Sequence, residues 1–137
     1  MLLKITKVKK CYKGPVGLVQ VLKEINLSLG AGETLALIGE SGSGKSTLLH
    51  LIAGLDTIDS GSISINGMEV SDLDENSRSK LRRTKLSIIF QQFNLITSLN
   101  VAANINFQAL ISGKHDSKYV HKLVQKLGLS DQMEKYP

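Results

Sequence analysis

The fold of this 137-residue chain is decided by the stretch Gly39-Glu40-Ser41-Gly42-Ser43-Gly44-Lys45-Ser46-Thr47. The stretch matches the pattern G-x-x-x-x-G-K-[ST] in full. Glycines let the backbone turn tightly and bring its N–H groups close to an anion. A helix that starts at this point directs its positive end to the same place. The alternative is a glycine-rich turn that only caps a helix.

The residues on either side supply the context that the motif requires. Leu35-Ala36-Leu37-Ile38, before the loop, is a continuous apolar run, as a strand buried on both faces would be. After the loop, Lys45 to Ala53 contains no strong helix breaker before Gly54. The order of strand, loop and helix therefore favours nucleotide phosphate binding over a simple capping turn.

The motif gives each polar side chain at its end a role. Lys45 reaches the β- and γ-phosphates of a nucleotide as a compact charge. The Ser46 hydroxyl is placed to ligate Mg²⁺, and Thr47 donates to a phosphate oxygen. The predicted phosphate-binding residues are Gly39, Glu40, Ser41, Gly42, Ser43, Gly44, Lys45, Ser46 and Thr47.

Composition and charge narrow the class of protein. The length suits one domain or part of one, and a hydrophobic content of 42% is enough for a core. No apolar run approaches the roughly 18 residues of a membrane span, and the N-terminus is unlike a signal peptide. A single cysteine, Cys11, excludes an internal disulfide. We therefore expect a cytosolic chain.

The net charge of +5 comes largely from two basic clusters. They are Lys7, Lys9, Lys10 and Lys13, and Arg78, Lys80, Arg82, Arg83 and Lys85. Such clusters can bind nucleic acid or anionic lipid, but solvated surface charge is the interpretation we favour, and we expect no nucleic-acid partner. The three histidines have no metal-ligand spacing, so a metal site made of protein ligands alone is not expected.

Periodicity and turn signals predict an α/β fold with an antiparallel element near the N-terminus and a helical part at the C-terminal end. Helix Lys45–Ala53 is apolar nearly all round and is expected to lie deep. Asn66-Gly67 predicts a hairpin turn. The expected strands are Leu2–Lys10, Leu18–Leu29, Thr34–Ile38, Ser62–Ile65, Met68–Val70 and Leu86–Phe90. The other expected helices are Asp72–Arg83, Asn100–Leu110 and Asp116–Leu127, the last of them capped by Gly128. A loop is expected over Gln91–Leu99.

In this order the motifs resemble the ATP-binding cassette (ABC) transporter ATPases along the whole chain. Tyr12 stands where that family places the aromatic residue that stacks on adenine. Phe90-Gln91-Gln92-Phe93-Asn94-Leu95 is similar to the family's glutamine loop. The chain has no Asn-Lys-x-Asp motif, which a small GTPase should carry. The stretch from Ile89 to Leu95, with Leu81-Arg82-Arg83 ahead of it, looks most like the subgroup for lipoprotein release and macrolide export.

The resemblance implies a P-loop NTPase core with ATP and Mg²⁺ as ligands. Gln91 is the matching glutamine, which in the family touches Mg²⁺ and the attacking water, so it is our expected catalytic residue and a metal ligand beside Ser46. The implied partners are a membrane-embedded transporter subunit and a second cassette, either a second copy or a complementary fragment. The implied location is the inner face of the cell membrane, as a peripheral cytoplasmic subunit powering export or release of a substrate.

The chain also departs from the family pattern. It contains no Leu-Ser-Gly-Gly-Gln signature and no Walker B strand, which is four apolar residues ending in Asp. The catalytic glutamate and the switch histidine of the family have no counterpart either. We therefore expect residues 1–137 to be the N-terminal portion of one ATP-binding domain, an incomplete cassette.

Three functional hypotheses follow. The first is an ATPase component of a transporter that, as this chain alone, binds ATP-Mg without efficient hydrolysis, because no carboxylate orients water. The second is a non-catalytic ATP-binding remnant or regulatory module. The third, a nucleic-acid binder, rests on charge alone and lacks the interleaved aromatic residues of a single-strand binder.

Overall fold

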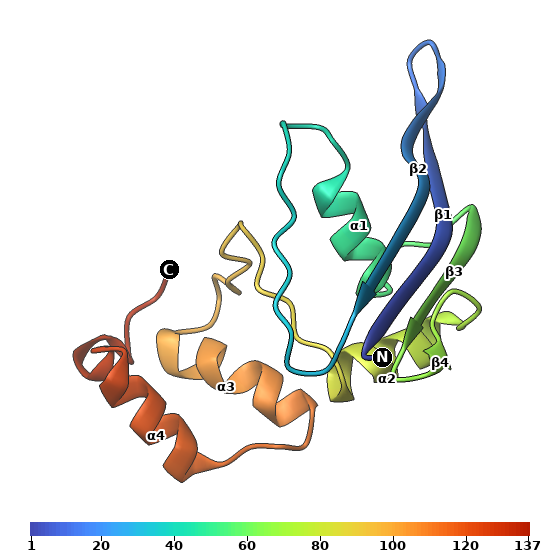
Figure 1. The fold of residues 1–137 in the computed structure, drawn as a ribbon. Coiled ribbons are helices and arrows are strands. Elements are labelled where there is room, and N and C mark those ends of the chain that lie inside the picture. Colours follow the sequence, from blue (N-terminus) through green and yellow to red (C-terminus); the bar gives the residue numbers. More distant parts are fainter. The chain divides into compact units, whose positions relative to one another are not determined.

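The computed structural model describes residues 1–137, apart from the side chain of Gln108. The chain divides into two compact units, Met1–Leu86 and Ser87–Pro137, and each is described by itself. The first unit holds an antiparallel sheet with two helices, and the second unit is helical (Figure 1). The α/β class with its N-terminal antiparallel element and C-terminal helical part is therefore confirmed.

The sheet of the first unit has the strand order β2-β1-β3-β4, and every neighbouring pair is antiparallel. Its strands are β1 (Leu3–Gly14), β2 (Gly17–Leu29), β3 (Ser60–Ile65) and β4 (Met68–Glu69). β1 and β2 form a long hairpin whose tip extends past the end of β3 (Figure 1). The predicted turn at Asn66-Gly67 joins β3 to β4, and both residues have the positive φ that a two-residue hairpin loop requires.

The core of the first unit lies between this sheet and helix α1 (Lys45–Ile52). Ile5 and Val8 from β1 and Ile63 from β3 are at most 2% exposed. Leu51 of α1 packs into the same cluster. Ile5 and Val8 are three positions apart, and a register shift between them, where Lys7 has a positive φ of 48°, interrupts the alternation of β1 and lets both residues join the core.

Helix α1 is less buried than its sequence predicts. Leu48 and Leu51 are buried, but Leu49 is 54% exposed and His50 is also exposed. A helix buries only the stripe that meets a neighbouring element, and three to four residues separate members of that stripe. The expectation that this helix lies deep was therefore wrong for the face that carries Leu49 and His50.

Helix α2 (Glu75–Thr84) begins at a side-chain cap, since Asp74 accepts a hydrogen bond from the backbone N–H of Ser77. Arg82 from its last turn donates to the carbonyl oxygen of Gly54 at 2.5 Å and to Glu75 at 2.7 Å. The contact with Gly54 attaches α2 to the chain that leaves α1, whereas the contact with Glu75 lies within α2. The predicted surface helix over this region is confirmed, with later bounds.

Two predicted strands are not formed. Thr34–Ile38 and Leu86–Phe90 have no strand assignment, and Ile38 and Ile89 are 94% and 99% exposed. Apolar composition alone does not make a strand, because the backbone N–H and C=O groups need a neighbouring strand to pair with. Within the described chain, all strand pairs are formed among the four strands β1, β2, β3 and β4, so neither segment has a partner strand.

The second unit contains α3 (Val101–Ile111), α4 (Ser117–Lys126) and the short 3₁₀ helix η1 (Ser130–Gln132). Asp116 caps α4 by accepting from the N–H groups of Lys118 and Tyr119, and Gly128 follows the helix with a φ of 66°. The predicted helices and the predicted loop from Gln91 to Leu99 are confirmed within one or two residues. Among the described residues, no helix has both the length and the apolar character to span a bilayer.

Candidate functional site

The loop from Gly39 to Thr47 leads directly into α1, whose first residue is Lys45. Gly44 is the residue before the helix and has a φ of 90°, which L side chains rarely adopt. A Cβ atom at this position would lie 2.8 Å from Leu22 Cδ2 and 3.0 Å from Val21 Cγ1. The third glycine of the motif is therefore required twice, by its backbone conformation and by its close packing against β2.

The start of α1 is open to an anion. No side chain of the described residues caps this helix by a hydrogen bond, in contrast to the caps at α2 and α4. The first N–H groups of a helix have no partner inside the helix and carry its positive partial charge. Ser46 and Thr47 lie in this first turn, and Ser46 is exposed. The donors of the loop thus fit a phosphate group.

Lys45 folds back over the loop that it is expected to serve. Its Nζ atom donates to the carbonyl oxygens of Gly39 at 2.8 Å and Glu40 at 2.6 Å, and to Ser43 Oγ at 3.2 Å. The ammonium group therefore lies inside the curve of the phosphate loop. An ammonium carries three donors on a flexible stem, so the same group can exchange these acceptors for phosphate oxygens.

Tyr12 projects from β1 beside the start of α1. Its hydroxyl donates to Asp56 Oδ2 at 2.6 Å, and its ring remains partly exposed, with 39% of the residue accessible. Burial of the hydroxyl and its hydrogen bond to Asp56 raise the pKa of Tyr12, while the Thr47 side chain acts in the opposite direction. The interaction with Thr47 brings the predicted adenine platform next to the last residue of the phosphate motif.

Asp56 and Lys10 complete this cluster, and the sequence interpretation did not select either. Lys10 is only 6% exposed, and its Nζ atom donates to Asp56 Oδ1 at 2.9 Å and to the carbonyl oxygen of Thr57 at 2.5 Å. The expectation that the first basic cluster is solvated was therefore wrong for Lys10. The period of two along β1 places Lys10 on the same strand face as Tyr12, and this was the available signal.

The carboxyl group of Asp56 is held in its charged form. Burial acts to raise the pKa of Asp56, but hydrogen bonds from Tyr12, Lys10 and the N–H of Thr57 outweigh it and lower the pKa overall. A carboxylate that accepts several hydrogen bonds strongly favours ionisation. The cluster therefore contains a charged carboxylate paired with a nearly buried ammonium group.

Gln91 lies in the second unit, at the start of the loop that precedes α3, and it is exposed. The neighbouring Phe93 is 91% exposed, and Asn94 has a positive φ of 48°. The structure therefore presents this stretch as an open, polar and aromatic loop. The metal-binding and catalytic role expected for Gln91 stays a prediction.

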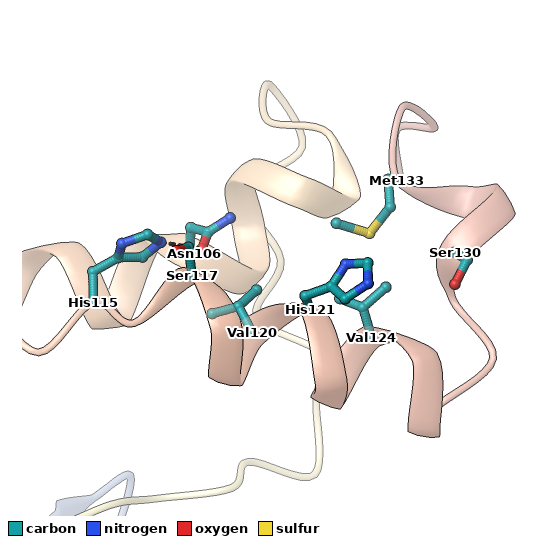
Figure 2. A pocket seen from close by; sticks show the side chains of 8 residues that line it. All are labelled: Asn106, His115, Ser117, Val120, His121, Val124, Ser130 and Met133. Atoms are coloured by element: carbon teal, nitrogen blue, oxygen red, sulfur yellow. Dashed lines mark hydrogen bonds between the residues drawn. The ribbon is translucent and has the colours of Figure 1, made fainter.

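A pocket of about 310 Å³ lies in the second unit, away from every predicted site residue along the chain. Figure 2 shows His115 turned toward Asn106, 2.9 Å from its side-chain oxygen, whereas His121 of α4 lies near Met133. Among the described residues, no group of three or more His, Cys, Asp and Glu side chains is arranged to hold a metal ion. The pocket is lined by Asn106, His115, Ser117, Val120, His121, Val124, Ser130 and Met133.

The comparisons with known proteins agree with this geometry. The family profile described as "ABC transporter" matches residues 22–137. The lipoprotein-releasing system ATP-binding protein LolD of Wigglesworthia glossinidia brevipalpis is 39% identical over 140 residues, which cover 100% of this chain and 61% of LolD. The macrolide export ATP-binding/permease protein MacB of Aggregatibacter actinomycetemcomitans is 42% identical over 122 residues, covering 87% of this chain and 19% of MacB.

Solved structures give the same result for the fold. The dimeric post-hydrolysis state of the ATP-binding cassette MJ0796, bound to ADP and Pi, superposes with a TM-score of 0.87 at 31% identity. The match covers 99% of this chain and 62% of that chain. This chain thus spans about three fifths of the LolD and MJ0796 chains that it matches. The phosphate loop, the sequence relatives and the fold together show that the chain belongs to the ABC transporter ATP-binding family, in the subgroup of LolD and MacB.

Proposed function

We propose that this chain binds ATP-Mg through its phosphate loop, as the ATP-binding part of a transporter that exports or releases a substrate. The observation that carries the proposal is the uncapped start of α1 beneath a loop whose curve already holds the Lys45 ammonium. The names of LolD and MacB favour a lipoprotein or a macrolide-like compound as the class of substrate.

Each residue of the loop has a defined task in this proposal. Lys45 leaves the carbonyl oxygens of Gly39 and Glu40 and donates to the β- and γ-phosphates instead. Ser46 would hold Mg²⁺ through its hydroxyl and Thr47 would donate to a phosphate oxygen, and the family resemblance makes Gln91 the candidate for a second metal contact. Bound ATP-Mg supplies the γ-phosphoryl group and the cation that neutralises its charge.

We propose further that the chain by itself holds ATP-Mg without efficient hydrolysis. Phosphoryl transfer to water needs a group that orients or deprotonates the attacking water. The sequence contains no counterpart of the family's Walker B strand or of the catalytic glutamate that would orient this water. This feature also favours the second candidate function, a regulatory module that binds ATP without turnover.

The remaining parts of a complete machine are proposed to come from other polypeptide segments. The unpaired apolar segments Thr34–Ile38 and Leu86–Phe90 suit completion of the sheet by strands outside this region, so we propose that residues 1–137 act as the N-terminal portion of one ATP-binding domain. The dimeric MJ0796 structures support a second cassette as a partner. A membrane-embedded subunit would then hold the assembly at the inner face of the membrane.

The proposed function is tested by measuring ATP-Mg binding and phosphate release on the same preparations of the full chain. Binding that is lost in Lys45→Ala, with phosphate release no greater than in that variant, is the expected result for the chain alone. Turnover should rise only when a candidate membrane partner or a polypeptide with Walker B and signature motifs is added. Absence of ATP binding in every one of these preparations would refute the proposal.

A further inference from the structure

One carboxylate, that of Asp56, joins the predicted adenine platform to a nearly buried lysine. Its Oδ2 atom accepts from the Tyr12 hydroxyl at 2.6 Å, and its Oδ1 atom accepts from Lys10 Nζ at 2.9 Å. Lys10 Nζ also lies 5.0 Å from the centroid of the Tyr12 ring. The three side chains therefore form a closed triangle in which every pair is in contact.

The triangle links two elements that both belong to the nucleotide site. Tyr12 and Lys10 are alternate residues on β1, and Asp56 follows shortly after α1, the helix that the phosphate loop starts. The Thr47 side chain also interacts with Tyr12. The orientation of the ring is thus fixed relative to the helix whose first turn faces the phosphates.

The triangle contains a buried charge, which a protein does not need for stability alone. Lys10 is 6% exposed, and burying an ammonium group is unfavourable unless it is paired and hydrogen-bonded. Three partners satisfy it here: the Asp56 carboxylate, the carbonyl of Thr57 and the face of the Tyr12 ring. A tyrosine on β1 whose ring needed no fixed orientation would require none of these contacts.

We propose that Lys10 and Asp56 are positioning residues that hold the Tyr12 ring in the orientation for stacking on the base of the nucleotide. The proposal rests on the proposed function, because it assumes that ATP is bound at the adjacent loop. The carboxylate fixes the hydroxyl end of the ring, and the ammonium group fixes the carboxylate and supports the ring. Both act through Tyr12, and neither is placed on the phosphates.

The opposing interpretation is that the triangle only anchors the chain after α1 to β1. The same stretch has another anchor of this kind at Asp59. Its Oδ2 atom accepts from the backbone N–H of Cys11 at 2.6 Å, and its backbone N–H donates to the carbonyl oxygen of Lys9. Asp59 has no described contact with the Tyr12 ring. Asp59→Ala, which removes the acceptor for the Cys11 N–H, is therefore the matched control for a loss of anchoring alone.

The experiment compares two ligands by calorimetry on the full chain: ATP-Mg, which has a base, and tripolyphosphate-Mg, which has none. Because stacking of a base on an aromatic ring adds to affinity, Tyr12→Ala should bind ATP roughly tenfold or more weakly than the wild type. We expect Asp56→Asn and Lys10→Met to weaken ATP by roughly three- to tenfold, because a misplaced ring loses part of that stacking. Affinity for tripolyphosphate should stay within about twofold in all three variants, since none donates to a phosphate.

Further variants separate positioning from folding. Tyr12→Phe keeps the ring but lacks the hydroxyl, so it should weaken ATP by about two- to fivefold, the size of one hydrogen bond. Adding Asp56→Asn to Tyr12→Phe should produce little further loss, because both changes remove the same contact. If Asp56→Asn alone does not fold, the double variant Lys10→Met/Asp56→Asn removes both charges and replaces it in the comparison.

The pattern of losses across the variants and the two ligands decides the proposal. A loss confined to ATP in the Lys10 and Asp56 variants, and absent from Asp59→Ala, supports it. An equal loss for ATP and tripolyphosphate, or unchanged binding of ATP, overturns it. Lys45→Ala should weaken both ligands, and if it weakens neither, then the proposed function fails, independently of the triangle.

Discussion

β3 and the segment Thr34–Ile38 are both short apolar stretches of the first unit, yet their surroundings are opposite. In β3, Ile63 is 1% exposed and Ile65 is 7% exposed. In the segment before the phosphate loop, Leu35 is 46% exposed and Ile38 is 94% exposed. β3 has β1 on one side and β4 on the other, whereas the segment pairs with no strand of the described chain. The difference shows that an apolar stretch becomes buried only where neighbouring strands and helices cover it, whatever its composition.

The unpaired segment affects the proposed nucleotide site because it leads into the phosphate loop. The loop is fixed at its C-terminal end by α1 and by the contact of Gly44 with β2. Its N-terminal end is held by the Lys45 hydrogen bonds to Gly39 and Glu40. We infer that the binding energy at this loop depends on α1 and Lys45 more than on the segment Thr34–Ile38 before it.

Shortening a side chain of β3, the stretch that has partner strands, should produce the largest effect on stability. Ile63→Ala removes a fully buried side chain between the sheet and α1, so we expect the free energy of unfolding to fall by about 2–5 kcal/mol. Urea denaturation measures it. Leu35→Ala on the unpaired side is the matched control, with an expected change of roughly 0.5 kcal/mol or less. Equal losses in the two variants would contradict the contrast between paired and unpaired segments.

A smaller effect is expected at the start of β3. Gly61 has a φ of 97°, and a Cβ atom there would lie 2.6 Å from the carbonyl oxygens of Thr6 and Lys7. Gly61→Ala should therefore destabilise the first unit by about 1–3 kcal/mol, by strain and overpacking together. Gly67→Ala shares the positive φ but meets nothing within 4 Å, so its melting temperature should fall less. A reversed order would show that this close approach of β1 to β3 is wrong.

The pH dependence of stability tests the anchor of the chain between α1 and β3. The pKa of Asp56 is lower in the folded state, so its contribution is complete above the ordinary value of about 3.9 and is lost as the pH falls through the folded pKa. The stability difference between the wild type and Asp56→Asn should therefore be larger at pH 6 than in strong acid. Asp74 and Glu75 also have lowered pKa values, and their effect cancels in this difference. A difference independent of pH would contradict the ion pair with Lys10.

The smallest effect on stability is expected at Ile38. Ile38→Thr should change the free energy of unfolding by less than about 0.5 kcal/mol, because the side chain is almost fully exposed. Self-association at high concentration, measured by light scattering, should nevertheless decrease, since exposed apolar edges promote strand pairing between molecules. Lys122→Thr, at an exposed position of α4, serves as the control and should not reduce association.

Features set by neighbouring residues were predictable from the sequence. The turn at Asn66-Gly67 and the helix stop at Gly128 depend on local backbone preferences, and both are formed. The phosphate loop also followed from a local motif, because the positive φ of Gly44 and the start of α1 at Lys45 are encoded within a few residues.

Features set by distant residues were not predictable. Thr34–Ile38 has the composition of a strand, but its pairing depends on which strands lie beside it. Lys10 belongs to a run of basic residues that resembles a solvated surface, and its burial depends on Asp56, 46 positions away. The role of Tyr12 in that cluster was hidden for the same reason, although the family resemblance singled out the residue.

The most direct test of the account is the affinity of the full chain for ATP-Mg, measured by isothermal titration calorimetry in the wild type, Lys45→Ala and Lys122→Ala. Lys45 lies inside the phosphate loop, whereas Lys122 is an exposed lysine of α4. We expect saturable binding at one site, weakened by roughly tenfold or more in Lys45→Ala and unchanged in Lys122→Ala, as for a charged phosphate contact. Binding that is equal in all three proteins, or absent from the wild type, would contradict it.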